Sequence, residues 1–166
     1  MKKIVIAVFA VAIGLVFSTS SFAISPYGPK GKRFGAGLYL GEPTGVTVKG
    51  YLTEQLAING VAAWSFTTES LMVIGDATFD FFDIDADTSV VNIPFYAGAG
   101  AVISIDGKRG SGRANGTTAG VRVPVGVGFQ WTRYPIEAFV EVGPGVRLAP
   151  NTEFDLTGGV GARFYF

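Results

Sequence analysis

The sequence predicts an all-β protein, an eight-stranded antiparallel up-and-down transmembrane β-barrel. Three observations lead to this prediction. From residue 34 onward, apolar side chains alternate with polar or small ones, which is the period of a strand with two different faces. No stretch of helical period occurs beyond the first 23 residues. The chain also begins with an export signal and ends on an alternating strand whose last residue is Phe166.

The N-terminal residues have the three parts of a secretory signal peptide. Lys2 and Lys3 supply the positive charge, an apolar run covers residues 4–17, and Ser21 and Ala23 flank the expected cleavage point. A membrane-spanning helix, the alternative, needs about 20 apolar residues, and this run is shorter. We therefore expect residues 1–23 to be a cleaved signal peptide, residues 24–33 a periplasmic leader, and residues 34–166 the barrel.

The composition of the exported part excludes several classes of protein. Cleavage after Ala23 removes two of the 13 basic residues and leaves a formal net charge of about −2, which gives no reason to expect a nucleic-acid partner. The absence of cysteine excludes a disulfide framework. A mean hydropathy of +0.39, with 24 glycines, suits hydrophobicity spread over many short strands.

The first four strands are expected at residues 34–40, 46–52, 56–66 and 71–81. In each, Phe, Leu, Ile, Val, Ala or Trp occupies most alternate positions, opposite Gly, Thr, Tyr, Asn or Asp. Residues 41–45 form the first turn, because Pro43 presets φ and Gly45 permits a left-handed exit. Short polar segments make the next two turns, and an acidic connection leads to the fifth strand.

The last four strands are expected at residues 93–104, 118–131, 136–142 and 154–166. Valine fills most alternate positions of the sixth, and aromatic and other apolar residues fill most of those of the eighth, namely Phe154, Leu156, Val160, Ala162, Phe164 and Phe166. Two prolines conflict with a closed sheet, which has no free edge for a missing N–H donor. We expect a β-bulge near Pro124, and we expect the seventh strand to end or bend near Pro144.

The alternation suits a membrane better than water. A soluble barrel turns its apolar face inward and a well-charged face outward, whereas the less apolar face here is mostly Gly, Ala, Thr and Tyr. In a membrane barrel the apolar face meets lipid, and small and polar residues fill the narrow interior. With both termini in the periplasm, the extracellular loops are expected at residues 41–45, 67–69, 106–116 and about 149–153.

Charged residues of both signs fall on the inward positions. Because buried charges persist only when paired, we predict a salt-bridge network inside the barrel. A gated or selective channel is the functional interpretation, but an eight-stranded interior is only about as wide as its side chains, which favours a network that closes it. The expected members are Lys49, Asp76, Arg122, Glu137, Glu141, Asp155 and Arg163.

The residues do not favour catalysis or metal binding. Hydrolytic and acyl-transfer sites usually need a histidine base, and the chain has none, so we expect no enzyme activity and no catalytic residues. Asp83, Asp85 and Asp87 have the opening spacing of a calcium loop, but Thr88 and Pro94 occupy the positions that require Gly and Glu. We expect an acidic turn there, with no metal and no cofactor.

One loop could make contacts outside the cell. Lys108, Arg109 and Arg113 give the loop 106–116 an excess of positive charge, suited to lipopolysaccharide phosphates or to an extracellular ligand. A solvated loop without a ligand is the alternative.

The chain resembles the compact eight-stranded outer-membrane barrels, of which the OmpA transmembrane domain and OmpX are familiar members. The resemblance rests on the strand count, the alternation, the signal peptide and the terminal Arg163-Phe164-Tyr165-Phe166. The resemblance implies that Phe164 and Phe166 present an assembly signal to the barrel assembly machinery. It also implies a monomer in the outer membrane of a Gram-negative bacterium, in contact with its lipids and lipopolysaccharide. We expect a non-catalytic structural or surface-interaction role; a small pore and a soluble periplasmic lipid-binding barrel are the alternatives.

Overall fold

The computed structural model describes residues 27–41, 43–65, 70–84, 90–106 and 116–166. The expected signal peptide, residues 1–23, lies outside them. Within the described residues no helix is long and apolar enough to cross a membrane. The elements there are the 3₁₀-helix η1 (Pro29–Gly31) and nine strand segments: β1 (Phe34–Gly41), β2 (Thr44–Tyr51), β3 (Leu56–Ser65), β4 (Ser70–Ile84), β5 (Val91–Asp106), β6 (Thr117–Arg122), β7 (Val125–Trp131), β8 (Ile136–Ala149) and β9 (Glu153–Tyr165).

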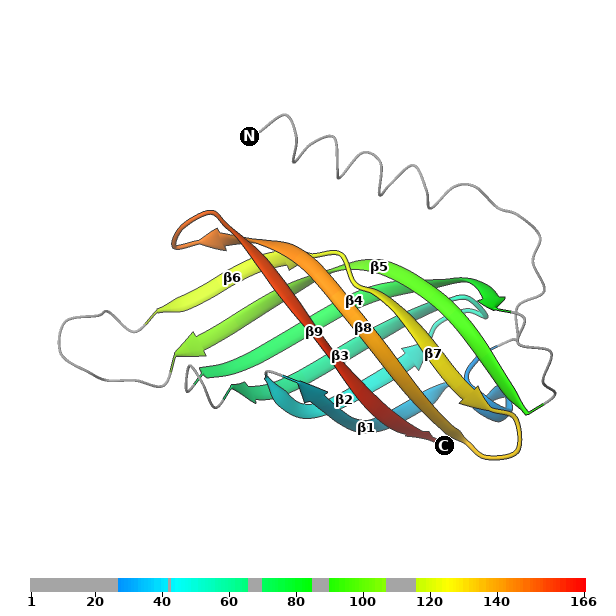
Figure 1. Ribbon diagram of the computed structural model, residues 1–166. Coiled ribbons are helices and arrows are strands. Elements are labelled where there is room, and N and C mark those ends of the chain that lie inside the picture. Colours follow the sequence, from blue (N-terminus) through cyan, green and yellow to red (C-terminus); the bar gives the residue numbers. More distant parts are fainter. Residues whose placement is uncertain (1–26, 42, 66–69, 85–89, 107–115) are drawn as a thin grey trace.

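The nine segments form one closed ring of eight antiparallel strands (Figure 1). Strands β1 to β5 pair in sequence order, and β9 pairs with both β8 and β1. Segments β6 and β7 follow one another along a single strand, because both pair with β5 on one side and β8 on the other. No described strand is left with a free edge, so the backbone hydrogen bonds close around the ring. The all-β, eight-stranded antiparallel architecture expected from the sequence is therefore confirmed.

The ring has two ends, which we name by the chain. The base is the end where β1 begins and β9 finishes, and the loop end is the opposite one. The connections β2–β3 and β7–β8 lie at the base, while β1–β2 and β8–β9 join at the loop end.

The two prolines behave differently from the prediction. Strand β8 does not end near Pro144 but runs on to Ala149, and no register shift occurs at Pro124. The pairing with β5 and β8 keeps one register on both sides of the two-residue break between β6 and β7, where the Val123 N–H donates to the Pro144 carbonyl. The reason is that each proline removes one N–H donor without adding a residue to its strand. The Pro144 nitrogen faces the Val123 carbonyl, whereas the Pro124 nitrogen faces β5, where the Gly98 N–H donates to the Pro124 carbonyl. The register shifts occur elsewhere, at Phe81 and Leu148.

Side-chain burial gives the ring an inverted distribution of polarity. Large apolar side chains are exposed on all eight strands, among them Leu38, Val48, Val73, Ile103, Phe129, Val140 and Leu156. The buried side chains include Lys, Arg, Asp and Glu as well as Tyr and Thr. In the strand residues whose exposure is described, the one exposed charged side chain is that of Glu153, at the first residue of β9.

Candidate functional site

The charged interior is the candidate functional site, and it begins with a base cluster near the end where β9 finishes. Its members are Lys49, Asp80, Glu137 and Arg163. Glu137 is fully buried and forms ion pairs with Arg163 at 3.2 Å and with the Lys49 amine at 3.8 Å. Asp80 lies 3.7 Å from the same amine. Four strands, β2, β4, β8 and β9, each contribute one charge, so the cluster ties together opposite walls of the ring.

A central cluster lies half-way along the strands and is built around Arg122. The Arg122 guanidinium donates two hydrogen bonds to Asp76, of 3.1 and 2.9 Å, and pairs with Glu141. Its remaining nitrogen donates to the Thr157 hydroxyl at 2.6 Å. Bidentate pairing of this kind suits the planar fork of arginine and fixes its orientation. Arg122 thereby crosses the interior from β6 to β4, β8 and β9.

Tyrosine hydroxyls complete the coordination of three of the four carboxylates. Tyr51 donates to Asp80 at 2.8 Å, Tyr96 to Glu141 at 3.0 Å, and Tyr165 to Glu137 at 2.7 Å. Among the described residues the two clusters hold three buried cations and four buried anions, so these neutral donors offset part of the excess negative charge. Tyr96 also joins the clusters, because the Lys49 amine lies 5.0 Å from the centre of its ring.

Glycines on the inward face make room for these side chains. A Cβ atom at Gly143 would come within 2.9 Å of an Arg122 guanidinium nitrogen, and one at Gly100 would overlap the Asp76 carboxylate. A Cβ at Gly128 would lie 3.0 Å from Glu137. The glycines of the inward face therefore leave the space that the charged side chains occupy, as expected for a narrow barrel.

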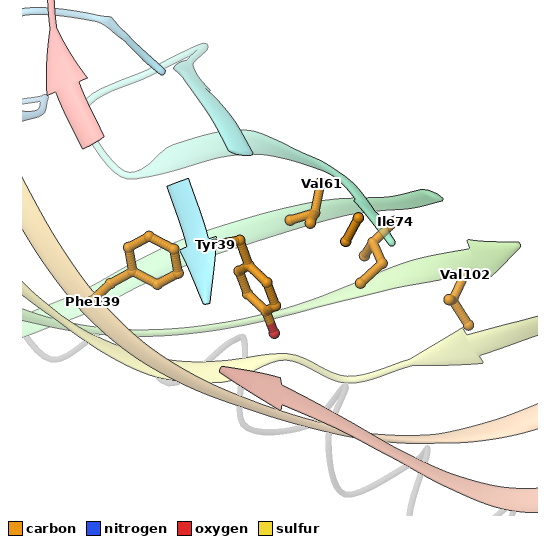
Figure 2. Close-up of a cluster of buried hydrophobic side chains, with 6 residues drawn as sticks. Tyr39, Val61, Ile74, Val102 and Phe139 are labelled. Atoms are coloured by element: carbon orange, nitrogen blue, oxygen red, sulfur yellow. The ribbon is translucent and has the colours of Figure 1, made fainter. Parts of the chain in front are cut away.

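Between the central cluster and the loop end lies a buried apolar cluster, with Ser65 and Ser70 buried beyond it where β3 and β4 meet. Figure 2 shows Phe139 and Tyr39 followed by three branched side chains, Val61, Ile74 and Val102. The Arg163 guanidinium lies 3.8 Å from the Phe139 ring centre, which links this cluster to the base. Charged and aromatic side chains thus share the interior from the base to the central cluster, and aliphatic ones follow toward the loop end.

Six of the seven residues predicted for the interior network lie in it: Lys49, Asp76, Arg122, Glu137, Glu141 and Arg163. The placement of Asp155 in the network was wrong. Its side chain is 28% exposed at the loop end of β9, where its partner is Arg147 at 3.8 Å. Asp155 has the inward parity, but it lies two residues beyond Thr157, above the depth of the central cluster.

Asp80 is the charged member that the sequence interpretation left out. The signal was present, because Asp80 follows Asp76 by four residues on the same face of β4. The tyrosine donors and Thr157 could not have been assigned from the sequence, since alternation gives the face of a residue but not its partner across the ring.

The remaining predicted residues lie apart from the interior. Phe164 and Phe166 are exposed on the outer face, and the Phe166 ring packs edge-on against Phe34 at a centroid distance of 5.1 Å. The cations of the loop, Lys108, Arg109 and Arg113, lie outside the described residues.

For metal binding, the described residues contain no group of three or more His, Cys, Asp or Glu side chains placed to hold an ion. The Asp83-x-Asp85-x-Asp87 segment falls partly outside the described residues, since 85–89 are not among them.

The comparisons with known proteins bear on the fold. No protein-family model and no curated protein matches the chain. Among solved structures, the crystal structure of the N-terminal β-barrel domain of Pseudomonas aeruginosa OprF matches with a TM-score of 0.60. It is 12% identical in sequence, and the match covers 84% of this chain and 100% of that one. The two share a fold. At this identity the similarity shows the barrel architecture and leaves function to the residues.

Proposed function

We propose that the protein is an integral outer-membrane β-barrel with a structural or surface-interaction role, non-catalytic, and closed inside by its buried ion pairs. The observation that carries the proposal is the belt of exposed apolar side chains on all eight strands. Soluble monomers rarely expose apolar patches larger than a few hundred Å². A single protein partner would cover one side of the ring, whereas lipid surrounds it.

The height of the belt supports the membrane assignment. Along β9 the outward apolar positions run from Phe154 to Phe164. At about 3.3 Å per residue and a strand tilt of about 40°, that stretch spans roughly 25 Å. This is the height of the apolar band in outer-membrane barrels, and the aromatic residues at its two ends suit the membrane interfaces.

The interior argues against a lipid carrier. A soluble barrel that binds lipid needs an apolar cavity and a polar outer surface. Here Arg122, Glu137 and Lys49 are buried inside, while the outer surface is apolar. The similarity in fold to the OprF barrel domain agrees with the membrane proposal.

A small pore is the second candidate. The charged clusters would line any path through the barrel, but their side chains are almost completely buried and paired across the ring. We therefore propose a closed interior, in which the network contributes packing and stability. Planar bilayers separate the two functions: folded protein without stepwise conductance supports the closed barrel, and steps that change in an Arg122 variant support the pore.

Cell fractionation with gel mobility tests the membrane proposal. The protein is expected in the outer-membrane fraction, and its apparent mass in SDS is expected to differ between unheated and boiled samples, because a closed barrel has no strand end from which to unravel. Recovery with the soluble periplasmic proteins, without a heat-dependent shift, would overturn the proposal.

A further inference from the structure

The segment before the first strand is folded against the base of the barrel. Residues 27–33 lie at the end of the ring that holds the C-terminus (Figure 1). Gly28 and Pro29 are buried, although they belong to no strand. The segment contains a tight turn in which the Gly31 N–H donates to the Gly28 carbonyl at 2.9 Å. These residues form a folded unit rather than an extended tail.

One side of this segment is packed tightly. The Tyr27 ring meets the Tyr51 ring edge-on at 6.5 Å and joins the cluster of Tyr51, Ala57 and Tyr165. The Arg33 guanidinium stacks over the Tyr27 ring at 4.3 Å and donates to its hydroxyl at 2.7 Å. The Lys32 amine donates to the carbonyl of Tyr165 at 3.4 Å. The contacts reach β2 and β9, the two neighbours of the strand that the segment leads into, and β3 beyond β2.

The other side reaches across the opening. Residues 28–31 line a pocket of about 260 Å³ together with Asn92, Gln130, Trp131 and Thr132, at the base of β5 and β7. Strand β5 stands opposite β1 in a ring of eight, so the segment spans the opening from one wall to the other. The pocket leaves space between the segment and the far wall.

The backbone of the segment is held in an unfavourable conformation. Tyr27 and Lys30 both have positive φ, at 65° and 59°, and they are the non-glycine residues with positive φ in the described chain. Such conformations cost about 1–3 kcal/mol each and persist when the surroundings impose them. For Tyr27, packing against the cluster of Tyr51, Ala57 and Tyr165 supplies that constraint, and its loss would release the strain.

From these observations we propose that residues 27–33 act as a lid that closes the base of the barrel over the base cluster and opens by swinging away from the β5 and β7 wall. With the lid in place, Ala57, Tyr165 and Glu137 are fully buried. With the lid displaced, water and small solutes reach the rings of Tyr51 and Tyr165 and then the charges of the base cluster. This inference goes beyond the proposed function and does not depend on membrane insertion.

Cysteine labelling tests the lid directly, because the chain contains no cysteine of its own. The probe site is Ala57→Cys, a small change at a position that the lid covers. The reference site is Glu54→Cys, in the exposed turn between β2 and β3. The reagent is a charged methanethiosulfonate, applied to protein folded in detergent, and far-UV circular dichroism establishes that each variant is folded.

Gly28→Val is the variant that displaces the lid. Gly28 has φ of −76°, which any residue adopts, but a Cβ there would lie 2.5 Å from the Tyr165 ring. Lys30→Gly is the matched control in the same segment, because glycine accepts the left-handed backbone and Lys30 is exposed. Tyr27→Ala is a second displacing variant, for use if Gly28→Val does not fold.

The expected result is slow labelling of Ala57→Cys, at least ten-fold slower than Glu54→Cys. Adding Gly28→Val or Tyr27→Ala should raise the Ala57→Cys rate at least ten-fold, while Lys30→Gly leaves it slow and Glu54→Cys stays constant throughout. Equal rates at Ala57→Cys with and without the displacing substitutions would overturn the proposal. So would fast labelling in the parent chain.

Discussion

Removing the Arg122 guanidinium should destabilise the barrel more than any exposed charge change. Arg122→Met keeps an unbranched apolar stem but removes the guanidinium, so it leaves Asp76 and Glu141 buried without their cation. Three of the hydrogen bonds that Arg122 donates go to these carboxylates. At about 1.5–3 kcal/mol per charged bond the gross loss is at most about 9 kcal/mol. Deletions of one partner in buried ion pairs cost about 3–5 kcal/mol, which is the loss we expect in the free energy of unfolding.

Two further variants show whether unpaired charge is the cause. Arg147→Met makes the same chemical change in a pair with Glu153 that is partly exposed at the loop end, and should cost less than about 1 kcal/mol. Arg122→Met combined with Asp76→Leu and Glu141→Leu removes the stranded anions as well. It should recover at least about 2 kcal/mol of the loss, because apolar replacements of a buried ion group are often neutral.

The assay is urea unfolding of protein folded into lipid vesicles, followed by the fluorescence of the two tryptophans, Trp64 and Trp131. Linear extrapolation gives the free energy of unfolding in the absence of urea. Equal costs for Arg122→Met and Arg147→Met would refute the reasoning. A triple variant less stable than Arg122→Met would refute it too, since the anions would then not be the source of the loss.

Four further substitutions, one of them a control, test other parts of the structure. Gly100→Val should cost about 1–3 kcal/mol in the same assay, because its side chain would collide with Asp76. Gly75→Val is the control: a Cβ there meets open space, so stability should change by less than about 0.5 kcal/mol. Equal effects of the two substitutions would contradict the packing described. Val140→Arg on the outer belt should cost about 2–4 kcal/mol in lipid vesicles, whereas a change below about 0.5 kcal/mol would indicate that this face meets water. Pro144→Val supplies an N–H opposite the Val123 carbonyl and should slow hydrogen exchange of the Val123 amide; unchanged or faster exchange would show that the prolines do not set the interruption.

Alternation in the sequence was sufficient to predict the faces of the strands. Residues of one parity, such as Val140, lie outside, and those of the other, such as Glu141, lie inside. The alternation does not tell how far along the barrel axis a residue lies, which is why Asp155 was expected in the network although it lies near the loop end. Depth depends on how far each strand is displaced relative to its neighbours, and that register is fixed by the ring as a whole.

The prolines and the N-terminal segment show a second limit. A proline's effect on a sheet depends on what faces its nitrogen, and the sequence does not reveal that the Pro124 nitrogen faces β5 while the Pro144 nitrogen faces Val123. The fold of residues 27–33 was likewise not predictable, because Tyr27 and Lys30 take a left-handed backbone that their side chains disfavour. At Tyr27, packing against the cluster of Tyr51, Ala57 and Tyr165, distant in the sequence, holds it.

The most direct test of the lipid-facing belt is the environment of a probe attached to it. A fluorophore on Val140→Cys, which pairs with Val160 within the outer belt, is compared with one on Glu54→Cys in the base turn. Both are placed in vesicles of lipids brominated in the middle of their acyl chains. The account predicts strong quenching at position 140 and little at position 54. Equal, weak quenching at both positions, in protein that circular dichroism shows to be folded, would contradict it, because the apolar face would then lie outside the membrane.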